Sequence, residues 1–144
     1  MGTKSIRHIV EENLQSYLAN STGLSQITFV TGDSNNTPTL PKAIVLCESA
    51  RAPNDLPEGL GNYSCSVRST LFSNADDTTL EVHRARCALI AGNMRDLTAI
   101  KEKFAYVGDA ACYDVTMQSE DEGVDERSWA TAFAFDVLVV LPPA

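Results

Sequence analysis

The stretch Trp129–Leu141, WATAFAFDVLVVL, decides the fold of this chain. Every second residue in it is bulky or β-branched: Trp129, Thr131, Phe133, Phe135, Val137, Val139 and Leu141. Between them, the small residues Ala130, Ala132 and Ala134 occupy the opposite face. This period of two predicts a strand with one buried face. At about 3.3 Å per residue the strand spans roughly 40 Å, which is long for a domain of this size, and Pro142-Pro143 ends it.

Four other segments upstream of it are predicted strands. Tyr63–Phe72 alternates between apolar and polar residues, and Cys112–Gln118 does so again, so each predicts a half-buried strand. The continuous apolar run Ala43–Cys47, AIVLC, predicts a strand covered on both faces. A short strand is expected at about Ile27–Thr31.

Two other parts of the chain show the periodicity of amphipathic helices. In Lys4–Leu18, apolar residues recur every three or four positions and form one stripe. The segment from Leu80 to Phe104 shows the same spacing behind a capping box, Thr78-Thr79-Leu80-Glu81. Gly92-Asn93 interrupts this second pattern, which predicts two helices in series or one kinked helix, with Asn93 able to cap the second and Gly108 ending the unit.

The resulting order of elements is α-β-β-β-α-α-β-β. We predict an α+β fold in a single domain over residues 1–144: one mixed or mainly antiparallel sheet of four to five strands, with an N-terminal helix and a central helix pair packed on it. Residues 50–61 form a long loop rich in proline and glycine, and the acidic residues 119–126 form a hairpin tip.

Bulk composition narrows the function. The net charge of -8 and the pI of about 4.6 argue against direct nucleic-acid binding, which needs a Lys/Arg surface. No apolar run approaches the roughly 20 residues of a membrane-spanning helix, and the first ten residues lack the apolar core of a signal peptide. Four scattered cysteines without a C-x-x-C pair indicate buried, reduced thiols in a cytosolic fold.

Sites for chemistry are few. Glycine-rich nucleotide loops and the G-x-S-x-G elbow are absent, and no cofactor is expected. His83 and Cys87 stand four residues apart, the spacing of two zinc ligands on one helix face, with Cys47 and Cys112 as further ligands. His83 with a cysteine is also a nucleophile–base pair. Because both residues fit the apolar stripe of their helix, a core cysteine beside a hydrogen-bonded histidine is the favoured interpretation.

Surface residues offer contact sites. The acidic segment, with Glu120, Asp121 and Glu122, lacks calcium-loop spacing and is interpreted as a solvated hairpin tip. Arg127 and Trp129 lie two residues apart, which allows two interpretations. Either the pair is an interface anchor, or the indole closes the edge of the core and the arginine lies over it. The interface candidates are these residues together with Arg51, Asp55 and Glu58 in the long loop: Glu120, Asp121, Glu122, Arg127, Trp129, Arg51, Asp55 and Glu58.

Several motifs form a set that resembles the tail terminator, or tail-completion, proteins of long-tailed bacteriophages. They are the amphipathic N-terminal helix, the strand ending at LFSNADD (71–77), the EVHR helix (81–84), the IAGNM segment (90–94), and the acidic hairpin that leads through DERSW (125–129) into a long last strand. The resemblance covers most of the chain, and residues 50–60 match nothing in it.

The resemblance implies a structural virion protein and not an enzyme. Such a subunit forms a ring, usually a homohexamer, in the neck of the virion. The ring caps the tail tube and joins it to the head–tail connector, and DNA passes through its acidic lumen without specific binding. The protein would therefore reside in the virion tail, and in the host cytoplasm during assembly, with no membrane contact. The alternatives are another head–tail joining piece, such as a head-closure or tube-related subunit, and a small enzyme or ligand-binding domain using Cys87 and His83.

Overall fold

The computed structural model describes residues 5–31, 40–51, 62–125 and 127–141. Its elements follow the predicted order: α1 (Ile6–Ala19), β1 (Thr28–Thr31), β2 (Lys42–Arg51), β3 (Asn62–Asn74), α2 (Leu80–Met94), α3 (Leu97–Val107), β4 (Ala111–Asp125) and β5 (Ser128–Val140). No helix in these ranges is long and apolar enough to cross a membrane.

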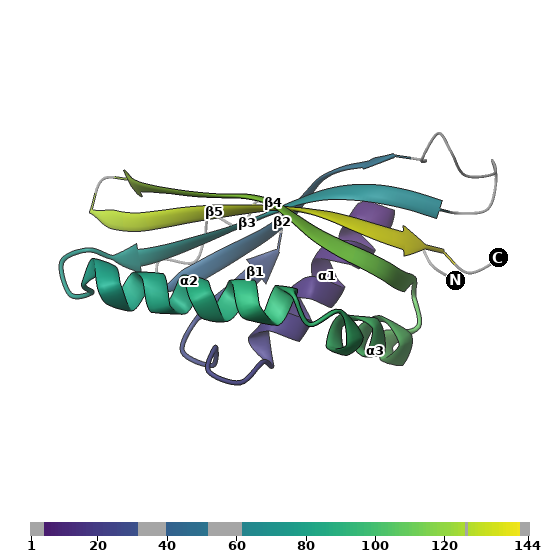
Figure 1. The fold of residues 1–144 in the computed structure, drawn as a ribbon, viewed down its shortest axis with the longest axis horizontal. Coiled ribbons are helices and arrows are strands. Elements are labelled where there is room, and N and C mark those ends of the chain that lie inside the picture. Colours follow the sequence, from purple (N-terminus) through teal and green to yellow (C-terminus); the bar gives the residue numbers. More distant parts are fainter. Residues whose placement is uncertain (1–4, 32–39, 52–61, 126, 142–144) are drawn as a thin grey trace.

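The five strands form one mixed sheet in the order β1-β2-β3-β5-β4. β1 pairs with β2 in parallel, and the other three pairings are antiparallel. Figure 1 shows the long strands as one twisted layer, with α2 running along one side of it and α3 following at the far end. This arrangement confirms the predicted α+β fold.

A single core lies between the helices and one face of the sheet. Alternate residues of β5 that face this core are buried, namely Thr131, Phe133, Phe135, Val137 and Val139, as the period of two predicted. From the helices, the buried apolar residues are Ile9, Val10, Leu14, Leu18, Cys87, Ile90, Met94, Ile100 and Phe104. The three alanines of β5 lie half-buried on the opposite face, which we call the open face.

The two long strands beside this core differ from their predicted form. Ile44 and Leu46 of β2 are only half-buried, so the prediction that Ala43–Cys47 is covered on both faces was wrong. The reason is that the helices pack on the other face of β2, where Ala43, Val45 and Cys47 lie. The acidic segment 119–125 is also not a loop, because β4 continues to Asp125 and pairs with β5 as far as Ser128.

The helix ends also need correction. Asn93 does not cap the second helix, because α2 continues through Gly92-Asn93 to Met94, and the side chain of Asp96 caps α3 by accepting from Ala99 N. The capping box is shifted by one residue, since Thr79 Oγ1 accepts from Val82 N at 3.2 Å. Gly108 ends α3 as predicted, with a φ of 84° that only glycine adopts without strain.

Candidate functional site

The acidic residues predicted as contacts lie on β4, at one edge of the sheet. Residues directly opposite each other in an antiparallel pair point to the same face. Glu120 is opposite Phe133 and Glu122 is opposite Thr131, so both lie on the helix side. Asp121 is opposite Ala132 and lies on the open face. The side chains of this acidic hairpin (residues 119–125 with the start of β5) are therefore divided between the two faces, and all three are exposed.

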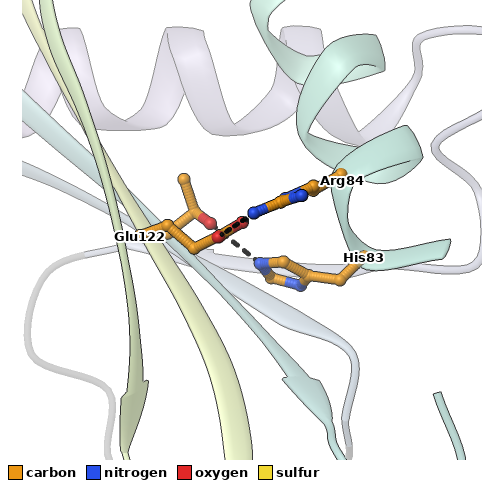
Figure 2. A network of polar contacts seen from close by, with 4 residues as sticks. His83, Arg84 and Glu122 are labelled. Carbon is orange, nitrogen blue, oxygen red and sulfur yellow. Dashed lines mark hydrogen bonds and ion pairs between the residues drawn. The ribbon is translucent and has the colours of Figure 1, made fainter. Parts of the chain in front are cut away.

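Glu122 is held by α2. Arg84 donates to both carboxylate oxygens, from Nε at 3.0 Å and from Nη2 at 2.7 Å. Figure 2 shows Arg84 reaching from α2 to Glu122 on β4, with the His83 ring next to this pair. The hydrogen bonds from Arg84 keep the pKa of Glu122 below its ordinary value. Since this pair lies at the surface, it fixes the position of the hairpin beside α2 more than it stabilises the fold.

Arg127 and Trp129 have different partners within the described chain. Trp129 is half-buried, and its indole Nε1 donates to the backbone oxygen of Thr78 at 2.8 Å. Arg127 is exposed and lies 3.7 Å from the Asp76 carboxylate, while its backbone oxygen accepts from Ala75 N at 2.8 Å. These contacts join the start of β5 to the turn between β3 and α2. The indole is thus engaged within the chain, and the arginine remains at the surface.

Of the other interface candidates, the structure describes Arg51, which lies at the far end of the sheet. Arg51 is the last residue of β2, where it is exposed and paired with Ser64 of β3. Asp55 and Glu58 fall outside the described residues, as does the rest of the predicted loop from residue 52 to 61. The structure therefore does not bring Arg51 close to the acidic hairpin.

His83 lies at the centre of a buried polar network. Its Nδ1 is 2.8 Å from Ser73 Oγ, and its Nε2 is 2.8 Å from Thr131 Oγ1. Arg86 Nη1 donates to the same Ser73 oxygen at 2.9 Å. The hydroxyl proton of Ser73 can then be donated to Nδ1, which places the ring proton on Nε2, toward Thr131. Both ring nitrogens are thus engaged by hydroxyl groups and neither points at a metal site.

Cys87, the partner proposed for His83, is buried one turn further along α2. Burial raises the pKa of its thiol, which disfavours the reactive thiolate. Cys47 and Cys112 belong to β2 and β4, strands on opposite sides of β3 and β5. In the described part of the chain, no group of three or more His, Cys, Asp or Glu residues could hold a metal ion. The arrangement fits a core cysteine beside a hydrogen-bonded histidine.

From the sequence we did not predict that the two edges of the sheet differ, with one of them bonded by side chains of α1. Three α1 side chains at intervals of four residues reach the β1–β2 edge and bond its backbone. Gln15 donates to Phe29 O at 2.9 Å, Glu11 accepts from Cys47 N at 2.7 Å, and Arg7 donates to Cys47 O at 3.0 Å. This edge is capped, whereas no described strand pairs with the outer edge of β4. The spacing Arg7-x₃-Glu11-x₃-Gln15, beside the apolar stripe, was the available signal.

No protein-family model and no curated protein sequence matches the chain.

Proposed function

We propose that this protein is a structural virion subunit that forms a ring at the head–tail junction of a long-tailed bacteriophage. In this role it acts as a tail terminator: the ring caps the tail tube, contacts the head connector and lets DNA pass. The proposal starts from the sequence resemblance described above, and the geometry of the sheet supports it.

The observation that carries the proposal is the difference between the two edges of the sheet. A ring built from identical subunits needs two unlike surfaces on each copy, because neighbours meet head to tail. One edge is capped by Arg7, Glu11 and Gln15 of α1. The other is the 15-residue strand β4, whose exposed side chains include Glu120, Asp121 and Glu122. Pairing of β4 with β4 of a second copy would bring like charges together, which favours a head-to-tail arrangement instead.

Charge also supports the passage of DNA. The chain carries 19 acidic and 11 basic residues. An acidic lumen repels phosphates, so DNA slides through it without being retained by counterion release. The polar contacts of His83 and the burial of Cys87 speak against the enzymatic alternative, because a nucleophile and its base must both reach substrate.

The test is direct observation of assembly. Purified protein, alone and mixed with tail-tube and connector proteins, is studied by native mass spectrometry and negative-stain microscopy. We expect closed rings, alone or on the end of tail tubes, and we expect the double variant Glu120→Lys/Asp121→Lys to assemble poorly. The matched control is Glu102→Lys, which is also exposed and lies on α3, outside the acidic hairpin. A strict monomer that binds neither tube nor connector would contradict the proposal.

A further inference from the structure

The outward face of α2 has a pattern of its own. The inward residues His83, Cys87, Ile90 and Met94 hold the helix on the core. The opposite face presents five residues in a spacing of four, three, four and three: Glu81, Ala85, Ala88, Gly92 and Arg95, the last of which is the C-cap. That spacing is the seam along which two helices pack in a coiled coil. All but Gly92 are exposed, and Val82 and Leu89 flank the seam with 46% and 41% of their surface accessible.

The middle of this seam leaves space that the described fold does not use. A Cβ atom built on Gly92 would meet no atom within 4 Å, so contacts inside the described chain do not require glycine there. Glycine within a helix costs roughly 0.5–1 kcal/mol relative to alanine. Ala85 and Ala88 are likewise too small to cover surface themselves. A second helix backbone can approach closely only where such small residues lie between the two axes.

The charges at the two ends of the seam identify the partner. Glu81 and Arg95 lie seven residues on either side of Ala88, and neither side chain has a hydrogen bond or ion pair with the described residues. In a parallel pair, Glu81 would face a second Glu81. In an antiparallel pair centred on Ala88, each Glu81 faces an Arg95, and the two helix dipoles also run in opposite directions.

We propose that α2 of one copy packs antiparallel against α2 of a second copy about a two-fold axis at Ala88. Glu81 then faces Arg95, and Ala88 faces itself. Between these two layers, Ala85 of one copy lies beside Gly92 of the other, offset along the axis by one residue because they stand three and four positions from Ala88. A single helix pair buries less than the roughly 1,200–2,000 Å² of a standard interface, so the dimer is weak. A two-fold contact cannot close a sixfold ring, and this inference therefore stands apart from the proposed function.

A charge exchange tests the pairing. Sedimentation velocity at concentrations from 5 to about 500 μM gives the dimer dissociation constant, which for an interface this small we expect near the upper end of that range. Glu81→Arg and Arg95→Glu should each raise it at least about tenfold, the equivalent of 1.4 kcal/mol, so that each single variant sediments as a monomer throughout this range. The double variant should restore it to within about threefold. Both single changes place charges that oppose the helix dipole, so restoration in the double variant cannot come from a more stable helix.

A second measurement, disulfide cross-linking, detects the proposed helix pair even if the protein also forms rings. Ala88→Cys places two thiols on the proposed axis, and oxidised glutathione should convert them to an intermolecular disulfide by thiol–disulfide exchange. Ala105→Cys on α3 is the matched exposed control and should cross-link at least about tenfold more slowly. Wild-type protein that stays monomeric at 500 μM without Ala88→Cys cross-linking, or a dimer unaffected by the charge exchange, overturns the inference. Ring assembly is scored separately by microscopy.

Discussion

The backbone N–H of Cys47 donates a hydrogen bond of 2.7 Å to the carboxylate of Glu11. This contact joins the first helix to the second strand just beyond the point where β1 ends its pairing with β2 at Val45. Glu11 is only 8% exposed. This charged helix side chain is therefore buried at a place where it accepts a hydrogen bond from a backbone N–H at the sheet edge. Arg7 completes the arrangement by bonding the oxygen of the same Cys47 peptide unit.

Replacing Glu11 should therefore destabilise the fold much more than replacing an ordinary surface acid. Glu11→Ala leaves the Cys47 N–H without its acceptor, and a hydrogen bond to a charged group contributes about 1.5–3 kcal/mol. Glu11→Gln keeps a neutral acceptor oxygen and should lose about half of that. Urea unfolding followed by circular dichroism gives the free energies. Glu102→Ala is the control, and equal losses in Glu102→Ala and Glu11→Ala would contradict the capping role.

Trp129 should contribute to stability through its indole nitrogen. Trp129→Phe keeps an aromatic ring but removes the donor to Thr78 O, so we expect a loss of about 1 kcal/mol. Because Trp129 is the only tryptophan, unfolding of this variant has to be followed by circular dichroism. Tyr106→Phe, at a side chain that is 87% exposed, is the matched control and should leave the midpoint unchanged. No change in Trp129→Phe would show that the hydrogen bond to Thr78 O does not contribute to stability.

The sequence predicted the fold well because its strands and helices carry clear periods. The alternation in β5 and the stripe of α1 specified which side chains are buried. The acidic end of β4 was missed because four charged residues in seven, with Gly123 among them, resemble a turn when read alone. It is a strand because β5 offers a partner for each residue, and that pairing is a long-range property.

The candidate site was less predictable for the same reason. The Arg84–Glu122 and His83–Thr131 contacts join residues 38 and 48 positions apart. Local spacing linked His83 to Cys87, but it carried no information on the hydroxyl groups of Ser73 and Thr131 that bond the ring. Similarly, nothing near Glu11 in the sequence indicates that its carboxylate accepts a hydrogen bond from the Cys47 N–H.

Ser69 should be a position where substitution stabilises the protein. It lies in the middle of β3, 2% exposed, between Val45 and Phe133, and its Oγ has no hydrogen-bond partner among the described residues. A buried hydroxyl without a partner costs about 1–3 kcal/mol, so Ser69→Ala should raise the free energy of unfolding by about 1 kcal/mol. The control is Ser66→Ala, a half-buried position on the open face of the same strand. A destabilised Ser69→Ala variant would show that the hydroxyl is satisfied in solution.

The four cysteines should be unreactive in the folded protein. All four are buried, and burial raises the pKa of Cys112 to about 11. Cys47 differs, because a hydrogen bond from the Cys65 thiol lowers its pKa and raises that of Cys65. We expect an aqueous disulfide reagent at pH 8 to label no thiol rapidly in native protein and all four in denaturant, with Cys47 the first to react during slow opening. Rapid native labelling of Cys87 would revive the enzymatic alternative.

Stability should fall in mild acid because of His83. Desolvation lowers the pKa of its ring below the ordinary value of 6.5, and the nearby Arg86 and Arg84 act in the same direction while Glu122 opposes them. The folded protein therefore holds the ring neutral, and the unfolded chain binds the extra proton first. The stabilisation is complete above pH 6.5 and is lost as the pH falls below it toward the folded pKa. His83→Gln, which retains a donor and an acceptor, should lower stability at pH 7.5 but flatten the slope between pH 6.5 and 5. Urea unfolding at four pH values, together with an NMR titration of the His83 ring protons, checks both effects. If the free energy of unfolding of His83→Gln depends on pH as steeply as that of the wild type, the acid sensitivity belongs to other groups.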